Sequence, residues 1–254
     1  MTPSPAPLRH AEAAVAVVGG GQLGSALSRA LREAGVRVDG PLGRGEDAAS
    51  VDVVLLCVPD SEIAAAVRAH ARDGRQIGHT SGATEVAQSG ADFGLHPLQT
   101  FLGGEGLEAF DGIGCAIAGR TPAALATARR LASALGAIPF EIADDARPAY
   151  HAAASIASNY LVTLQAAAEQ IAAGAGLSRG DARALLAPLV RSTVENWAAH
   201  GPASALTGPI ARGDEATVAR QRAAVAGHAA ELLPLFDVLA DRTRVLAATR
   251  ETAP

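Results

Sequence analysis

Two histidines, His96 and His151, are the side chains best suited to acid–base chemistry. An imidazole with its ordinary pKa titrates near neutral pH, so either one could supply a proton or a hydrogen bond to a developing charge. Pro97 favours an extended backbone at His96. Ser155 and Asn159 follow His151 at four-residue intervals, which places the three on one face of a helix. We therefore expect His96, His151, Ser155 and Asn159 to form a catalytic set, with His151 slightly favoured as the donor.

This polar stripe stands among alanine, isoleucine and leucine residues. A buried polar stripe must find partners or cost stability. Hydrogen bonds between packed helices are one alternative to a substrate site, and His96 could equally be a structural residue at a strand end. The stripe nevertheless falls on the first helix after about residue 145, where the alternation of predicted strands and helices gives way to helices alone. This position suits a cleft between two domains.

A glycine-rich turn indicates dinucleotide binding. Gly19, Gly21 and Gly24 match G-x-G-x-x-G, after the apolar run 15–18 and before a predicted helix. The first glycine allows a tight turn, the second lets a diphosphate approach, and the third allows close packing of helix on strand. The alternative is an ordinary strand-to-helix turn. The free N–H groups that open the helix would hold the diphosphate, which assigns this part of the site to Gly19, Gly21, Gln22, Leu23 and Gly24.

Arg44 favours NADP over NAD. It lies just past a second predicted strand, 36–38, where a guanidinium could bind a 2′-phosphate with two hydrogen bonds. Asp39 is also close, but we place it inside the strand and not at its end, where a ribose-binding acid belongs. The alternative is a solvated loop arginine.

Two further strand ends should border the cofactor. The nearly all-apolar run 51–58 predicts a strand that is covered on both faces, ending near Val58 and Pro59. Strand 76–79 ends in a run of small hydroxyl residues that includes Ser81. Open parallel sheets bind ligands at such ends, so Val58, Pro59 and Ser81 join the predicted cofactor site, although Ser81 could simply cap its own turn.

The order of the elements predicts an α/β fold, an N-terminal Rossmann-type doubly wound sheet followed by an all-α C-terminal domain. We expect a disordered leader (1–12), a dinucleotide-binding domain (13–145) and a helical substrate and dimerisation domain (146–254). In the last of these, helices are predicted over 147–173, over 182–199 with a kink near Pro188, and over 215–250 in two pieces around Gly227 or Pro234. Ser178 should cap the second helix.

The composition narrows the function. The net charge is −5, so the composition gives no sign of the basic surface that binds nucleic acid. All 21 cationic side chains are arginine, which excludes lysine Schiff-base chemistry and a phosphate-loop lysine. Cys57 and Cys115 read as buried strand residues and not as a metal site. No apolar run reaches bilayer length, so we expect a cytoplasmic protein with no membrane contact.

Three phrases carry a resemblance to the 6-phosphogluconate dehydrogenase-like superfamily of two-domain reductases, and within it to bacterial Rossmann-like proteins with a helical C-terminal domain of unknown function. The phrases lie at 95–101, 158–161 and 206–214. Better-known relatives carry a lysine four residues before the asparagine that Asn159 matches, and Ser155 stands in its place. His96 and Pro97 match the His-Pro of prephenate dehydrogenases. Ketopantoate reductases and deazaflavin-dependent NADP reductases are also similar.

Together, the residues and the resemblance predict an NADP-dependent oxidoreductase acting on a small carbonyl, imine or hydroxyacid substrate. Ketopantoate reductase-like or prephenate dehydrogenase-like chemistry would be compatible with it. Arg212 would be a carboxylate clamp or a structural loop residue. The alternative from another class is a non-catalytic NADP-binding sensor or partner protein. The alanine-rich helical half and the superfamily both predict a homodimer.

Overall fold

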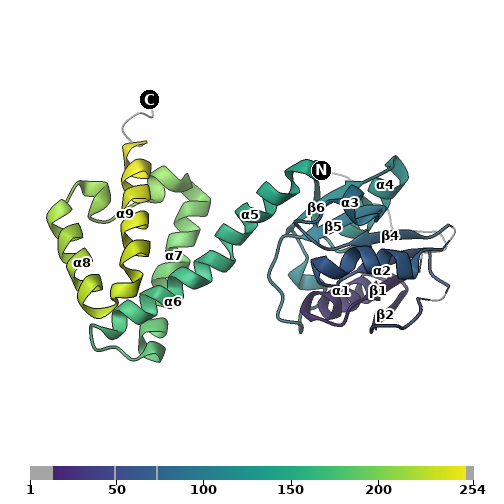
Figure 1. Cartoon of the computed structure of the whole chain (residues 1–254), viewed down its shortest axis with the longest axis horizontal. Helices are drawn as coiled ribbons and strands as arrows, with labels where there is room; N and C mark the ends of the chain where they lie inside the picture. Colours follow the sequence, from purple (N-terminus) through teal and green to yellow (C-terminus); the bar gives the residue numbers. More distant parts are fainter. Residues whose placement is uncertain (1–13, 49, 73, 250–254) are drawn as a thin grey trace, which may run out of the picture. The chain divides into compact units, whose positions relative to one another are not determined.

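The computed structural model describes residues 14–48, 50–72 and 74–249 (Figure 1). The chain forms two compact units, of which the first ends at Ser158 and the second begins at Asn159. The first contains the sheet and the second is helical. The leader predicted over 1–12 lies outside the described residues.

The first unit is built on a seven-stranded sheet in the order β2-β1-β3-β4-β5-β6-β7. The chain runs from β1 to one side for β2 and to the other side for β3, which is the topological switch of a doubly wound sheet. The α/β fold with a helical C-terminal region is thereby confirmed. The strands are β1 (Val15–Val18), β2 (Val38–Leu42), β3 (Val53–Leu56), β4 (Gln76–His79), β5 (Phe93–Pro97), β6 (Gly114–Gly119) and β7 (Ile138–Glu141).

Neighbouring strands are parallel except for β5 and β6, which pair antiparallel from Phe93 opposite Gly119 to Pro97 opposite Cys115. A parallel neighbour needs a long crossover, usually through a helix. The connection from β5 to β6 contains only the short turn η2 (Leu107–Ala109), so the chain returns in the opposite direction.

Helices cover both faces of the sheet. Val15 and Val17 of β1 belong to the core under α1 and α4, whereas Ala16 and Val18 belong to the core under α2. Successive strand residues point to opposite faces, so a strand that is covered on both sides reads as a continuous apolar run. The helices of this unit are α1 (Gln22–Glu33), α2 (Ile63–His70) after the turn η1 (Asp60–Glu62), α3 (Val86–Ser89), α4 (Pro122–Ala134), and α5 (Arg147–Ala157) after the turn η3 (Asp144–Ala146).

Strand β2 lies later in the sequence than predicted. It begins at Val38, where the predicted strand 36–38 was to end, and runs to Leu42. Asp39 is inside the strand, as expected, and Arg44 follows its end. The register places Leu42 opposite Val18, so this end reaches the same edge of the sheet as the glycine turn.

One predicted helix is two. The stretch 147–173 was expected to be continuous, but α5 ends at Ala157 and α6 (Asn159–Ala173) begins after Ser158, whose φ of −115° and ψ of −74° lie well away from ideal helical values. No glycine or proline signals this break. The four-residue spacing therefore keeps only His151 and Ser155 on one continuous helix, and Asn159 starts the second compact unit.

The second unit consists of α6, α7 (Arg179–Ala205), α8 (Glu215–His228) and α9 (Leu233–Ala248), with the short turns η4 (Ile210–Arg212) and η5 (Ala230–Leu232). Ser178 caps α7 by accepting a hydrogen bond from the N–H of Asp181, as predicted. Pro188 does not take the backbone out of the helical region; Gly201 does, with a φ of 74°. The last helical stretch is divided before Pro234, close to the predicted place.

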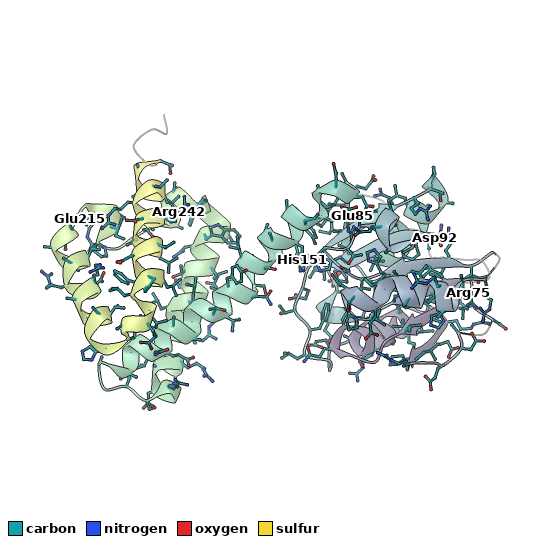
Figure 2. The ribbon with its side chains drawn as sticks, viewed as in Figure 1. Arg75, Glu85, Asp92, His151, Glu215 and Arg242 are labelled. Carbon is teal, nitrogen blue, oxygen red and sulfur yellow. The ribbon has the colours of Figure 1, made fainter. Side chains whose placement is uncertain are left out.

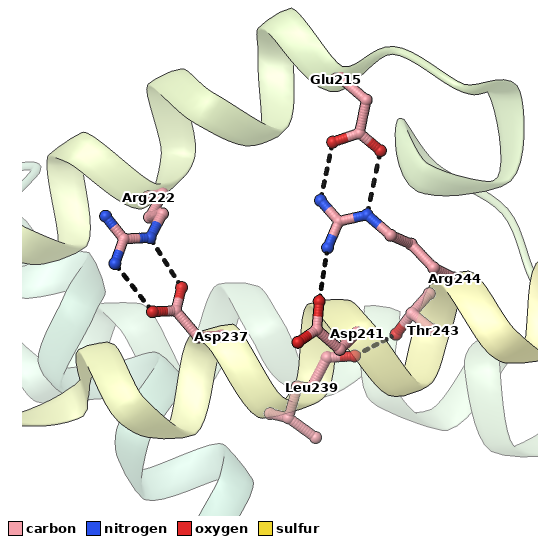
Figure 3. Close-up of polar contacts among 7 residues, drawn as sticks. All are labelled: Glu215, Arg222, Asp237, Leu239, Asp241, Thr243 and Arg244. Carbon is pink, nitrogen blue, oxygen red and sulfur yellow. Dashed lines mark hydrogen bonds and ion pairs between the residues drawn. The ribbon is translucent and has the colours of Figure 1, made fainter.

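Ion pairs join α8 to α9 (Figure 3). Arg222 donates to both carboxylate oxygens of Asp237 at 2.8 Å, and Arg244 donates to both oxygens of Glu215 and to Asp241. Exposed pairs add little stability, but forked arginine contacts fix a geometry. None of the described helices combines the length and the apolar character that crossing a membrane requires.

Candidate functional site

A cleft of about 510 Å³ opens at the carboxyl edge of the sheet, entirely within the first compact unit. Ligands of open α/β sheets bind outside this edge. The cleft is lined from the turn after β1, from the ends of β3, β4 and β5, and from α5. Its residues are Gly21, Gln22, Leu23, Gly24, Cys57, Val58, Pro59, Asp60, Thr80, Ser81, Gly82, His96, Pro97, Gln99, Phe101 and His151.

The glycine turn has the geometry that a dinucleotide site needs. A Cβ on Gly19, whose φ is +110°, would stand 2.2 Å from the Cys57 carbonyl oxygen, and one on Gly24 would stand 1.9 Å from the Gly19 carbonyl oxygen. Both positions therefore require glycine, one for the turn and one for close packing. Gly21, by contrast, faces open space.

Gly21 is also the N-cap of α1 and offers no side-chain acceptor to the first turn. The opening N–H groups of a helix have no acceptor within the helix, and with the helix dipole they attract an anion. Gly21 to Gly24 line the cleft, so these N–H groups can hold a diphosphate there. The residues present are those that the diphosphate of a dinucleotide requires.

Arg44 lies beyond the cleft lining, two residues after β2. Its Nη2 donates to both carboxylate oxygens of Glu62, at 2.8 and 2.9 Å, and its side chain is 85% exposed. The N–H of Gly19 donates to the carbonyl of Leu42 at 2.9 Å, which ties the end of β2 to the glycine turn. Arg44 therefore lies near the edge of the sheet that bears the glycine turn, and Glu62 holds its guanidinium.

His96 pairs with Tyr150 of α5. The Tyr150 hydroxyl lies 2.8 Å from His96 Nδ1, and the two rings meet edge to face. Burial, and then the nearby His151 and Arg147, lower the pKa of His96 to about 4. Burial raises the pKa of Tyr150 to about 12. Both groups are therefore neutral at pH 7, and the expectation that His96 titrates near neutral pH is corrected by its burial.

His96 and His151 converge on Gly82. Their ring centroids are 5.9 Å apart, and a Cβ on Gly82 would stand 2.7 Å from His151 Nδ1 and 2.9 Å from His96 Nε2. His151 lies in the first turns of α5, beside the sheet (Figure 2). Its Nδ1 is buried, and no described residue gives it a hydrogen-bond partner. Only a glycine leaves room for both imidazoles at this point.

Ser81 organises the loop after β4. Its hydroxyl donates to Asp60 Oδ2 at 2.8 Å and accepts from the N–H groups of Ala83 and Thr84. This is the self-capping turn that the sequence left open as an alternative, and it also places Ser81 on the cleft wall. Asp60 adds a carboxylate to the same wall.

The two thiols have raised pKa values. Burial raises the pKa of Cys57 and of Cys115 to about 12, so both stay protonated at neutral pH. Cys57 borders the cleft behind the glycine turn, and Cys115 is buried in β6.

Most predicted site residues come together at the cleft. Ser155 is one turn beyond His151 and does not line it, and Asn159 belongs to the other compact unit. Sequence reasoning placed Asp60 at a strand end that borders the cofactor and Tyr150 beside the polar stripe, but gave neither a role in the site. It gave no role to Gly82, His79 or Arg147. The only sequence signal for His79 was its position at the end of a predicted strand. The predicted residues that line the cleft are Gly21, Gln22, Leu23, Gly24, Val58, Pro59, Ser81, His96 and His151.

Comparison with known proteins identifies a family and a fold. The model of a domain of unknown function, DUF2520, matches residues 113–243, just over half of the chain. No curated protein matches significantly. A protein from Thermotoga maritima is 23% identical, with a TM-score of 0.76 over 93% of this chain and 99% of that one. A candidate NADP oxidoreductase from Bacteroides fragilis is 20% identical, with a TM-score of 0.74 over 92% and 98%.

A third similar structure contains a nicotinamide cofactor. Pyrroline carboxylate reductase from Plasmodium falciparum, solved with NADP bound, is 11% identical to this chain. Its TM-score is 0.60, over 92% of this chain and 98% of that one. At such identities, these structures establish the shared fold: a Rossmann-type sheet followed by a helical region.

Proposed function

We propose that this chain, which belongs to the DUF2520 family, is an NADP-dependent oxidoreductase acting on a small carbonyl, imine or hydroxyacid substrate. One observation carries the proposal: a single cleft joins an open glycine turn at a helix N-terminus to two convergent imidazoles. The first is what a dinucleotide needs, and the second is what a substrate that gains or loses a hydride needs. The candidate NADP oxidoreductase and the NADP-bound reductase of similar fold support the cofactor assignment.

A bound nicotinamide supplies or accepts the hydride in such a reaction. The chain must then stabilise the charge that develops on the substrate oxygen or nitrogen. In this proposal, His96 Nε2, which lies beside Gly82 with the His151 ring as its neighbour, forms a hydrogen bond to that atom. Asp60 and Ser81 on the adjacent wall orient the rest of the substrate.

The Tyr150–His96 pair supplies the proton. A phenol is a strong donor and a neutral imidazole nitrogen a strong acceptor, so we assign the 2.8 Å contact as Tyr150 O–H donating to Nδ1. The remaining ring proton then sits on Nε2, toward the cleft. When Nε2 gives its proton to a substrate alkoxide, Nδ1 takes the proton of Tyr150 and leaves a tyrosinate, a much weaker base than the alkoxide. His96 thus works from its neutral form, as its lowered pKa requires.

A second candidate function is a non-catalytic NADP-binding sensor. The whole chain lacks the lysine on which better-known relatives depend, and this observation favours it. Titration with NADPH, followed by absorbance assays with keto acids, imines and hydroxyacids, separates the two. Binding with turnover supports the enzyme, binding without turnover supports the sensor, and no binding overturns both.

Histidine variants test the roles within the enzyme. His96→Ala or His151→Ala should lower turnover by roughly 10²–10⁴-fold and leave NADPH affinity nearly unchanged, because the glycine turn is intact. Equal loss of affinity and turnover would instead show that these side chains hold the cofactor.

We also infer that the protein is a homodimer. Leu185 and Leu189, four residues apart on α7, are 64 and 62% exposed, and Trp197, two turns farther along the same helix, is 55% exposed. An exposed apolar row of this kind marks an interaction surface. A second copy of this alanine-rich helical unit could bury these apolar side chains against the same surface of its own, as in a symmetric dimer.

A further inference from the structure

Arg147 is the largest of the fully buried side chains in the described part of the chain. Charged side chains are rarely buried unless they are paired. Its guanidinium instead donates to two backbone carbonyls, from Nε to Thr84 at 2.9 Å and from Nη2 to Ser81 at 2.6 Å. Nη1 has no partner among the described residues. A positively charged side chain is thus buried behind the loop that lines the cleft, and no ion pair with a carboxylate is formed among the described residues.

Gly94 leaves the space that this guanidinium occupies, because it has no side chain. A Cβ on Gly94 of β5 would stand 3.0–3.2 Å from Nη2, Nη1 and Cζ of Arg147. Gly94 and His96 are two residues apart on the strand, so they share one face of the sheet. The guanidinium therefore lies flat on the strand that carries His96.

The two carbonyls that Arg147 binds enclose Gly82. Arg147 also opens α5, and Tyr150 and His151 follow three and four residues later, on the same side of the helix. One guanidinium therefore joins the loop that contains Gly82 to the helix turn that presents both aromatic partners of His96. Asp144, just before α5, adds a second tether by accepting from the N–H groups of Val86 and Ala87.

We propose that Arg147 is a positioning residue of the cleft, which fixes the loop after β4 against α5 and so sets Tyr150 and His151 over Gly82. Of the measurements that test this role, only enzyme turnover depends on the proposed function. The loop and the helix are far apart in sequence, and the forked contact to Ser81 and Thr84 joins them directly.

The charge of Arg147 has a measurable electrostatic consequence. Burial is the largest cause of the lowered pKa of His96, and likewise of His79, a fully buried neighbour whose pKa is about 4 and whose ring nitrogens have no described partner; the charge of Arg147 lowers both values further. The other groups that act on His96 are His151 and Asp60; His151 lowers its pKa and Asp60 raises it. Removing the guanidinium should therefore raise the pKa of His96.

The test uses the full chain with isotope-labelled histidine, in which NMR follows the titration of each imidazole. Arg147→Met should raise the pKa of His96 above about 4, with burial, the largest cause of the lowered value, still in place, and it should speed amide exchange in the loop 81–84. The matched control is Arg72→Met, which removes an exposed arginine that pairs with Asp47. It should change neither quantity. Unchanged titration and unchanged loop exchange in Arg147→Met would overturn the proposal.

Arg147→Lys covers the case in which the methionine variant fails to fold. Lysine keeps the charge but lacks the fork that reaches both carbonyls. We expect His96 to keep its low pKa, loop exchange to accelerate, and turnover to fall at least tenfold with NADPH affinity within twofold. Wild-type loop exchange in this variant would contradict the positioning role. Absence of turnover in the unmodified protein would defeat the proposed function alone, since the titration and exchange readouts need no substrate.

Discussion

The Tyr150 hydroxyl lies 2.8 Å from His96 Nδ1 and so connects the helix that follows the sheet to the strand that carries the histidine. Because both groups are neutral at pH 7, this contact decides which ring nitrogen of His96 bears the proton. In our account, Nε2 bears it and presents it to the cleft.

Tyr150→Phe removes this partner and keeps the ring. We expect turnover to fall about 10–100-fold, within the range of general acid–base catalysis, with little change in NADPH affinity. Steady-state kinetics and cofactor titration measure both. Tyr160→Phe, at a 58% exposed position on α6, is the control. Full activity in Tyr150→Phe would show that the pair does not supply the proton.

Gly82→Ala fills the point on which the histidines converge. The new Cβ would stand 2.7 Å from His151 Nδ1 and 2.9 Å from His96 Nε2, so one ring must move. Overpacking of this kind costs about 1–3 kcal/mol, and we expect turnover to be lost along with it. Gly227→Ala, where a Cβ meets nothing within 4 Å, should leave activity unchanged. An active and fully stable Gly82→Ala protein would disprove the convergence.

Arg44 should make NADP(H) bind more tightly than NAD(H). A charge-assisted hydrogen bond is worth roughly 1.5–3 kcal/mol, which is about tenfold to a hundredfold in affinity. Arg44→Ala should remove the preference. Glu62→Gln should strengthen NADPH binding severalfold, because it neutralises the carboxylate that holds Arg44. Calorimetry with both cofactors decides the matter, and equal affinities in the unmodified protein would defeat the assignment.

Acid should destabilise the first unit through His79. Its folded pKa of about 4 lies below the unfolded value of about 6.5, so the unfolded chain binds more protons between these values. The free energy of unfolding should therefore fall as the pH drops through this window, by up to about 3 kcal/mol for this residue. Urea unfolding at several pH values measures it. His79→Gln should make the free energy of unfolding depend less on pH. An equally steep pH dependence in this variant would show that His79 is not its cause.

Self-association follows from the exposed row on α7. Light scattering should give twice the 25.5 kDa chain mass at micromolar concentration. Leu185→Glu combined with Leu189→Glu should yield monomers, since charges cannot be buried without partners. A monomeric unmodified protein would overturn this inference.

Local signals in the sequence were sufficient for much of the fold. Strand β4 has the predicted bounds, and Ser178 caps α7 as its spacing with Asp181 indicated. Both depend on neighbouring residues only. The break at Ser158 has no glycine or proline to announce it, and the antiparallel return of β6 depends on a connection that forms no full helix.

The site divides in the same way. The glycine turn and the strand ends are local features, and their residues meet at the cleft. The contacts of His96 with Tyr150, and of Arg147 with Ser81 and Thr84, join residues more than 50 positions apart. Periodicity within one segment cannot reveal such contacts. The lowered pKa of His96 likewise arises from burial that only the fold creates.

A crystal structure of the protein with NADPH tests the central claim most directly. We predict that the diphosphate lies on the N–H groups of Gly21 to Gly24 and that the nicotinamide C4 faces the space above Gly82, with a ring nitrogen of His96 or His151 no farther away than one bridging water. A dinucleotide bound elsewhere, or a nicotinamide directed away from both imidazoles, would contradict the account.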